Sequence, residues 1–284
     1  YPGYDNLMPR SAATIAEVLR QNGWSTAMFG KHHNTPEPQV SPAGPFDLWP
    51  TGLGFEYFYG FMAAEANQFT PGLYRNTTPI PTLREGVLDK ALADEAIHWI
   101  HAQKAAAPDK PFFVYYATGS THNPLQAPAD WIARFRGMFD QGYDAVRAAT
   151  VRRQLAMGVI PKGTVDTPRP VGITSWKELT PAQKRVNARM MEVYAAMLAY
   201  QDAQVGRVLD ELDRMGQGDN TLVVFIEGDN GAAPESDRDG STNPMAGFAN
   251  GFQESSDQLA ARIGTFGGTD SVGGYGFGWA WAMN

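Results

Sequence analysis

Three short apolar or aromatic segments of the chain each run directly into a cluster of polar residues. Residues 24–29 (WSTAMF) lead into residues 31–34 (KHHN), residues 111–117 (PFFVYYA) lead into residues 118–124 (TGSTHNP), and residues 221–227 (TLVVFIE) lead into residues 228–231 (GDNG). Apolar runs of this length, rich in β-branched or aromatic side chains and bounded by turn residues, predict buried strands. The fold must therefore bury these three strands and leave a polar loop after each of them.

Segments with helical periodicity separate the predicted strands. We expect helices over residues 11–22, 88–106, 128–139 and 143–157, and a long helix from Thr180 to Met215. Thr14 with Glu17, and Thr180 with Gln183, have the spacing of helix-capping boxes. Helices that alternate with buried strands predict an α/β fold with a largely parallel sheet flanked by helices. Ligands of such sheets bind beyond the carboxyl ends of the strands, where all three polar clusters are expected.

Two stretches of the chain lack a sustained period. Residues 34–86 are rich in Pro, Gly and aromatic side chains and predict a long ordered loop region, because disorder would leave the aromatics exposed. Residues beyond 232 are dominated by Gly, Ser, Asp and Asn. We therefore assign residues 1–235 to one α/β domain and residues 236–284 to a Gly-rich, irregular continuation of the same domain.

Charge and composition limit the possible partners. The formal net charge is −7, which argues against binding to nucleic acid or to an anionic membrane surface. No apolar run approaches the roughly 18 residues of a membrane-spanning helix, so we expect a soluble protein. The chain has no Cys, so neither disulfides nor thiol chemistry can indicate a compartment. Periplasmic, extracellular and cytoplasmic locations in a bacterium all stay open, as does the oligomeric state.

Asp229 and Asn230 are the candidate metal ligands. A carboxylate and an amide oxygen lie side by side at the end of a predicted strand, with Gly on both sides. Oxygen ligands of this kind suit Ca²⁺ or Mg²⁺ rather than Zn²⁺. The alternative is that Asp-Asn-Gly is only a common turn sequence.

Lys31, His33 and His122 are the candidate catalytic residues. An ammonium and an imidazole could hold the oxygens of a tetrahedral anion, and His122 could donate a proton to a leaving oxygen. The alternative is that these are solvated or structural side chains, and His32 in particular is interpreted as solvated. His98 and His101 are interpreted as part of a helix surface, because no carboxylates join them to make a metal site.

The three segments, taken in order, resemble the sulfatase family of the alkaline phosphatase superfamily. Residues 14–34 (TIAEVLRQNGWSTAMFGKHHN) resemble the family's helix, strand and G-K-x-H loop, residues 111–128 (PFFVYYATGSTHNPLQAP) resemble a strand followed by x-H-x-P, and residues 221–232 (TLVVFIEGDNGA) resemble the block that ends in S/G-D-N-G. Residues 41–59 and 278–284 are also similar to bacterial arylsulfatases. The resemblance implies an alkaline phosphatase-like α/β fold that is incomplete in this chain.

The resemblance also assigns roles. It implies that Lys31 and His33 contact the sulfate ester and the nucleophile, and that His122 stabilises or protonates the leaving oxygen. It implies that Asp229 and Asn230 bind a divalent cation, usually calcium. The family's nucleophile is a formylglycine hydrate made from Cys or Ser in a C/S-x-P/A-x-R motif, and these 284 residues contain no such motif.

We therefore expect an internal piece of a longer protein, which would supply the nucleophile motif and an early acidic pair. Two ligands are few for a cation that takes about six to eight, so metal binding by this chain should be weak and the chain itself inactive. The expected activity is that of a sulfuric ester hydrolase, arylsulfatase-like, acting on a small-molecule sulfate monoester. The alternatives are a phosphonate or phosphate ester hydrolase of the same superfamily and a non-catalytic pseudo-sulfatase.

Overall fold

The computed structural model describes residues 8–9, 11–228, 231–234 and 236–284. They form two compact units. The first, here called the sheet unit, comprises Tyr1–His122 and Tyr200–Thr221, and the second, the helical unit, comprises Asn123–Ala199 and Leu222–Asn284. The long helix α5 (Pro181–Arg214) begins in the helical unit and ends in the sheet unit. No helix in the described part of the chain is long and apolar enough to cross a membrane.

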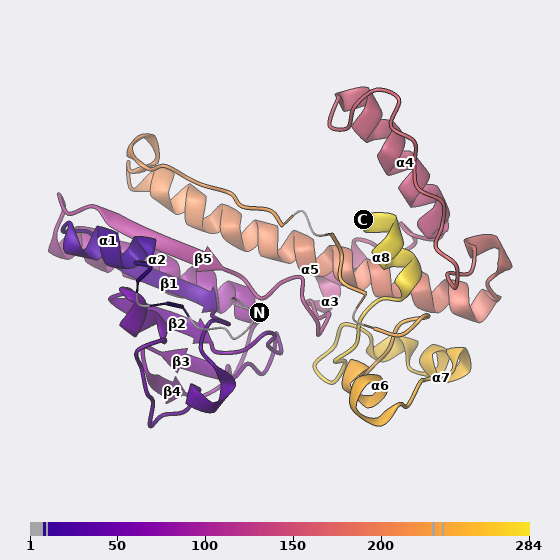
Figure 1. Cartoon of the computed structure of the whole chain (residues 1–284), viewed down its shortest axis with the longest axis horizontal. Helices are drawn as coiled ribbons and strands as arrows, with labels where there is room; N and C mark the ends of the chain where they lie inside the picture. Colours follow the sequence, from indigo (N-terminus) through magenta and orange to yellow (C-terminus); the bar gives the residue numbers. More distant parts are fainter. Residues whose placement is uncertain (1–7, 10, 229–230, 235) are drawn as a thin grey trace. The chain divides into compact units, whose positions relative to one another are not determined.

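The sheet unit is built on a five-stranded sheet in the order β4-β3-β2-β1-β5 (Figure 1). The strands are β1 (Ser25–Lys31), β2 (Tyr57–Phe61), β3 (Leu73–Arg75), β4 (Thr78–Ile80) and β5 (Phe112–Ala117). β1 pairs in parallel with both β2 and β5, whereas β3 and β4 add antiparallel pairs at one side. The predicted α/β fold is confirmed, with a sheet that is mixed rather than largely parallel.

Alternate residues of β1 pack on opposite faces of the sheet. Ala27 and Phe29 join a core with helix α2 (Leu88–Ala106) and with the last part of α5, whereas Met28 joins a core with Ala16 of helix α1 (Ile15–Gln21) and Trp49. Because the side chains of a strand alternate between its faces, β1 needs cover on both sides. The sheet is therefore a buried middle layer whose functional loops can lie only at its ends.

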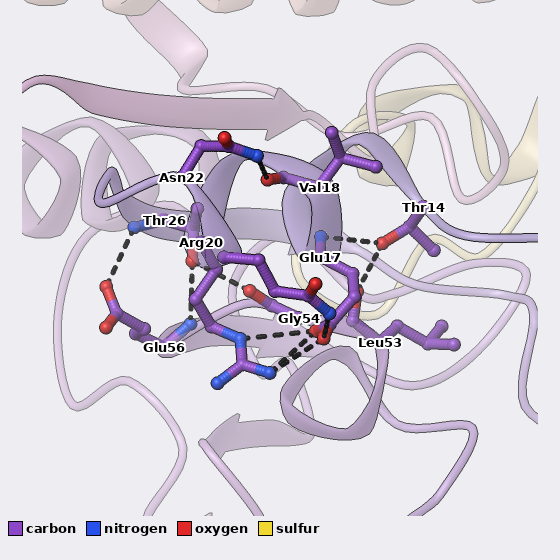
Figure 2. A network of polar contacts seen from close by, with 10 residues as sticks. Thr14, Glu17, Val18, Arg20, Asn22, Thr26, Leu53, Gly54 and Glu56 are labelled. Carbon is purple, nitrogen blue, oxygen red and sulfur yellow. Dashed lines mark hydrogen bonds and ion pairs between the residues drawn. The ribbon is translucent and has the colours of Figure 1, made fainter.

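Helix α1 is anchored to the sheet by the polar network in Figure 2. Thr14 is the N-cap residue, as the sequence predicts, and its hydroxyl accepts a bond of 3.0 Å from the Glu17 backbone N–H. The same hydroxyl donates to the Leu53 carbonyl oxygen, and Thr26 of β1 donates to the Gly54 carbonyl oxygen at 2.8 Å. These bonds fix the start of α1 and the 53–54 turn against the amino-terminal end of β1.

Gly30 allows the three parallel strands to approach closely. Its φ of +107° is one that side-chain-bearing residues rarely adopt, and a Cβ there would lie 1.8 Å from the Ala117 carbonyl oxygen. The first strand was predicted to end before Gly30, but β1 continues through it to Lys31. Gly30 thus lets the end of β1, at Lys31, lie close to the end of β5.

The prediction of a long loop over residues 34–86 is wrong, because β2, β3 and β4 lie within it. Two short 3₁₀ helices, η1 (Glu37–Gln39) and η2 (Pro50–Leu53), precede them. The aromatic run of β2, Tyr57–Phe61, has high β-propensity, but surrounding Pro and Gly obscured its period. β2 is a central strand, and its loss from the prediction hid one of the loops that form the candidate site.

The predicted strand over residues 221–227 is also absent from the described structure. Residues 221–228 form neither helix nor strand, and Leu222, Val223, Val224, Phe225 and Ile226 are 56–88% exposed. An apolar run indicates that a segment is suited to a sheet, but a strand forms only where a neighbour satisfies its backbone N–H and C=O groups. This apolar segment has the composition of a buried strand without its pairing.

The helical unit packs short helices around the first part of α5. They are α3 (Ala129–Ala133), α4 (Gly142–Met157), η3 (Trp176–Glu178), α6 (Pro244–Asn250), α7 (Ser256–Ala261), η5 (Ile263–Thr265) and α8 (Phe277–Met283); η4 (Gly218–Asn220) belongs to the sheet unit. Trp279, fully buried, meets the rings of Tyr143 and Trp176 edge-on. Residues 236–284 therefore contain three short α-helices and are not irregular throughout, and α3 is shorter than the helix predicted over residues 128–139. The assignment of 1–235 and 236–284 to one domain stays a prediction.

Candidate active site at the carboxyl edge of the sheet

Lys31 is the last residue of β1, and His33 follows two residues later. Lys31 is half-buried and His33 is exposed. In the sheet register Gly30 lies opposite Ala117 of β5, and Lys31 lies opposite Phe61 of β2. The loops that leave β2 and β5 therefore begin on either side of Lys31, because the three strands are parallel and end at the same edge.

His122 lies in the loop that follows β5 and contacts a carboxylate from the loop that follows β2. Its Nδ1 is 3.5 Å from Oε2 of Glu65, with 28% of the histidine side chain and 49% of the glutamate side chain exposed. This contact joins the loops on both sides of β1, and Lys31, His33 and His122 thus share one edge of the sheet. Sequence reasoning missed Glu65, because the strand before it was not recognised.

His32 is buried, and its interpretation as a solvated side chain is wrong. It is 4% exposed, and its Nε2 lies 3.1 Å from the Leu48 carbonyl oxygen and 3.1 Å from Thr35 Oγ1. A carbonyl oxygen only accepts hydrogen bonds, so Nε2 carries the proton. Burial lowers the pKa of His32 to about 4, so that it is neutral at pH 7 and holds the loop after β1 in place.

A buried carboxylate supports the loop that carries His122. Asp89, in the first turn of α2, is 1% exposed and accepts a bond of 2.5 Å from the Ser120 hydroxyl. Gln68 Nε2 donates to the same hydroxyl oxygen at 3.2 Å. Burial raises the pKa of Asp89 to about 6, and the Ser120 bond partly offsets this. The signal in the sequence is an acidic residue among the apolar positions of the helix.

Asp229 and Asn230 lie outside the described residues. For the predicted calcium site, the structure therefore shows only whether other residues could serve as ligands. The described residues contain no group of three or more His, Cys, Asp or Glu side chains that could hold a metal ion. The described residues therefore contribute no such cluster of their own, and the ligand role of Asp229 and Asn230 stays a prediction.

The two histidines of α2 belong to its surface, as predicted. His98 is exposed, and His101, half exposed, contacts Glu211 of α5. Neither of them lies in the loops at the carboxyl edge of the sheet. The candidate site residues of the sheet unit that the structure describes lie instead at the end of β1 and in the loops after β1, β2 and β5.

The layered α/β sheet has a lysine ammonium, imidazoles and a carboxylate beyond the ends of its parallel strands. This is the architecture of an enzyme that binds its ligand at that edge. Comparison with known proteins makes the class more definite. A family model described as Sulfatase matches residues 2–264, and the chain belongs to the sulfatase family.

Two curated relatives agree with this membership. The chain is 33% identical over 251 residues to an arylsulfatase of Klebsiella aerogenes, covering 82% of this chain and 50% of that protein. It is 35% identical over 241 residues to an uncharacterized sulfatase of Schizosaccharomyces pombe, covering 81% of this chain and 43% of that protein. The chain thus spans half or less of the length of these relatives.

A solved structure agrees at the level of the fold. The crystal structure of yidJ from Bacteroides fragilis, named as a sulfatase, matches with a TM-score of 0.52 at 18% identity. The match covers 75% of this chain and 42% of that one. At this identity the match shows that the two chains share a fold, and it does not show a shared activity.

Proposed function

We propose that the protein is a sulfuric ester hydrolase of the arylsulfatase type, which converts a sulfate monoester to an alcohol or phenol and sulfate. The observation that carries this proposal is the contact between Glu65 and His122, which joins the loops after β2 and β5 on either side of the strand that ends at Lys31, in a member of the sulfatase family. The arylsulfatase named among its relatives supports the aryl subclass.

In this proposal the Lys31 ammonium and the His33 imidazole hold the anionic oxygens of the ester. An acidic protein needs such a local positive site to bind an anion, and charge stabilisation at the reacting group provides the largest share of the rate. As a nucleophile bonds to sulfur and the ester sulfur–oxygen bond breaks, His122 donates a proton to the leaving oxygen, which departs as the alcohol or phenol. Glu65 orients the ring, because it faces Nδ1 and so turns Nε2 away from itself.

Asp229 and Asn230 are proposed as two ligands of a divalent cation, calcium being the ion that the family resemblance implies. Among the described residues, no group of three or more His, Asp or Glu side chains could complete its coordination. The formylglycine motif is absent from these 284 residues, so the 284-residue chain expressed by itself is proposed to be inactive.

The test is turnover of 4-nitrophenyl sulfate and 4-nitrophenyl phosphate by the full-length protein and its variants. We expect the sulfate to be preferred. Lys31→Ala and His122→Ala should each lower kcat/KM by about 10²-fold or more. Lys162→Ala and His98→Ala, which remove an exposed lysine and an exposed histidine elsewhere, should leave it unchanged.

Three outcomes would overturn parts of the proposal. A strong preference for the phosphate would favour the phosphate ester alternative, and no turnover of either compound would favour a pseudo-sulfatase. Full activity of the Lys31 and His122 variants would remove these residues from the site.

A further inference from the structure

Among the described residues, the Asp89 carboxylate makes one hydrogen bond, and it goes to the loop that carries His122. Oδ2 accepts from Ser120, and Oδ1 is buried without a hydrogen-bond partner in the described part of the chain. A carboxylate in this position costs stability, since burial removes it from water and one hydrogen bond does not replace what is lost. Packing of α2 alone would be better served by an apolar residue.

Ser120 is held on two sides. A serine hydroxyl has one proton to donate, which goes to Asp89, and its oxygen accepts from Gln68. Gln68 is itself 1% exposed, and its backbone carbonyl oxygen accepts from the Leu88 backbone N–H at 2.7 Å. The start of α2 and the chain before it therefore form one rigid support for Ser120.

The loop between β5 and His122 is short, so that holding Ser120 also holds the histidine. The His122 backbone N–H donates to the Gly119 carbonyl oxygen at 3.1 Å, which closes a turn around Ser120. Thr118 Oγ1 donates to the Ser120 carbonyl oxygen at 3.1 Å, and Gln201 of α5 binds the same threonine. Little freedom is left between the Asp89 bond and the direction in which His122 projects.

We propose that Asp89 is a positioning residue of the active site: through Ser120 it fixes the loop after β5, so that the His122 imidazole lies where the leaving oxygen of the ester departs. This inference rests on the proposed function, in which His122 is the proton donor. The helix position also suits a carboxylate, because the first turn of a helix is electropositive.

The kinetic test compares phenyl sulfate with 4-nitrophenyl sulfate in the full-length protein. Phenolate is the poorer leaving group and depends more on proton donation, so Asp89→Ala should lower kcat about 10- to 100-fold for phenyl sulfate and by much less for 4-nitrophenyl sulfate. Asp89→Asn, whose amide oxygen can still accept from Ser120, should restore most of the rate. Ser120→Ala should reproduce the loss, and the double variant with Asp89→Ala should lose no more than either single variant.

Asp109→Asn is the matched control, since Asp109 is an exposed aspartate in the turn before β5, at the opposite end of that strand. Equal losses on both esters, or additive losses in the double variant, would show a general structural role and overturn the inference.

Hydrogen exchange separates failure of this inference from failure of the proposed function. Amides of residues 118–122 should exchange faster in Asp89→Ala than in the wild-type, Asp89→Asn and Asp109→Asn proteins, with the rest of β5 unchanged. Unchanged exchange in that loop would refute the support by Asp89, whatever the activity. If the wild-type protein turns over neither ester, the proposed function fails, and the exchange comparison still decides whether Asp89 fixes the loop.

Discussion

His32 and His33 are neighbours in sequence with opposite environments. His32 is enclosed behind the loop after β1 and bonded to backbone and hydroxyl groups, whereas His33 is exposed at the edge of the sheet. Two adjacent histidines in a polar loop look alike in a sequence, because only the fold decides which ring turns inward. One of them therefore supports the loop, and only the other can meet a ligand.

The pKa of about 4 for buried His32 predicts a specific loss of stability in acid. An unfolded histidine has a pKa near 6.5, so the unfolded state takes up a proton first as the pH falls. The contribution is fully present above about pH 6.5 and is lost toward pH 4, at up to about 1.4 kcal/mol per pH unit. Urea unfolding at pH 7 and pH 5 measures it.

Two variants isolate the contribution of His32 to the pH dependence of stability. His32→Asn should lower stability at pH 7, because packing and bonds are lost, but it should flatten the dependence between pH 7 and pH 5. Lys162→Ala, at an exposed lysine elsewhere, should keep the wild-type dependence, because lysine does not change its charge between pH 7 and pH 5. A His32→Asn protein whose stability falls as steeply as wild type would show that another group titrates.

The lysine, histidine and acidic residues at or near the sheet edge were partly predictable. Lys31, His33 and His122 follow recognisable strands, and the structure brings their loops to one edge, although their roles stay a proposal. Glu65 was not predictable, because its position depends on β2, and Asp89 was not, because its partner Ser120 lies 31 residues away in sequence. Contacts between distant segments leave no local pattern.

At the scale of elements, the capping network of α1 makes the next prediction. Thr14→Ala removes the acceptor for the Glu17 N–H and the donor to Leu53, and should lower the free energy of unfolding by about 1 kcal/mol. Thr14→Ser keeps the hydroxyl and should stay close to wild type. Denaturant unfolding of the three proteins measures the difference, and equal stability of Ala and Ser variants would contradict the role of the cap.

The elements best predicted from sequence are those with their own periodicity. Helix α2 is found at its predicted bounds, and β1 and β5 lie within a residue or two of theirs. β2 was not predicted, because an aromatic run between prolines and glycines has no clear period. The apolar run over residues 221–227 failed for the opposite reason, since its period is clear but the described chain gives it no strand to pair with.

At the scale of the whole molecule, the sheet unit depends on residues from two distant parts of the chain. The face of the sheet that α2 covers is completed by Val208 and Leu212 of α5. The prediction of the fold class needed only the alternation of helices and strands, whereas the division into two units could not be predicted, because α5 is continuous in sequence and serves both.

The exposed apolar segment Leu222–Ile226 has a consequence for how this chain behaves in concentrated solution. Five consecutive apolar side chains without Pro, Gly or charge, lying open to solvent, form a site for intermolecular cross-β stacking. The 284-residue chain should therefore form thioflavin-T-positive aggregates with a concentration-dependent lag. Val224→Lys should lengthen that lag severalfold, whereas Val165→Lys, at a still more exposed valine elsewhere, should not. Identical lag times for the two variants would mean that another segment drives the aggregation. Leu222–Ile226 would then no longer be expected to limit how long the chain can be stored in solution.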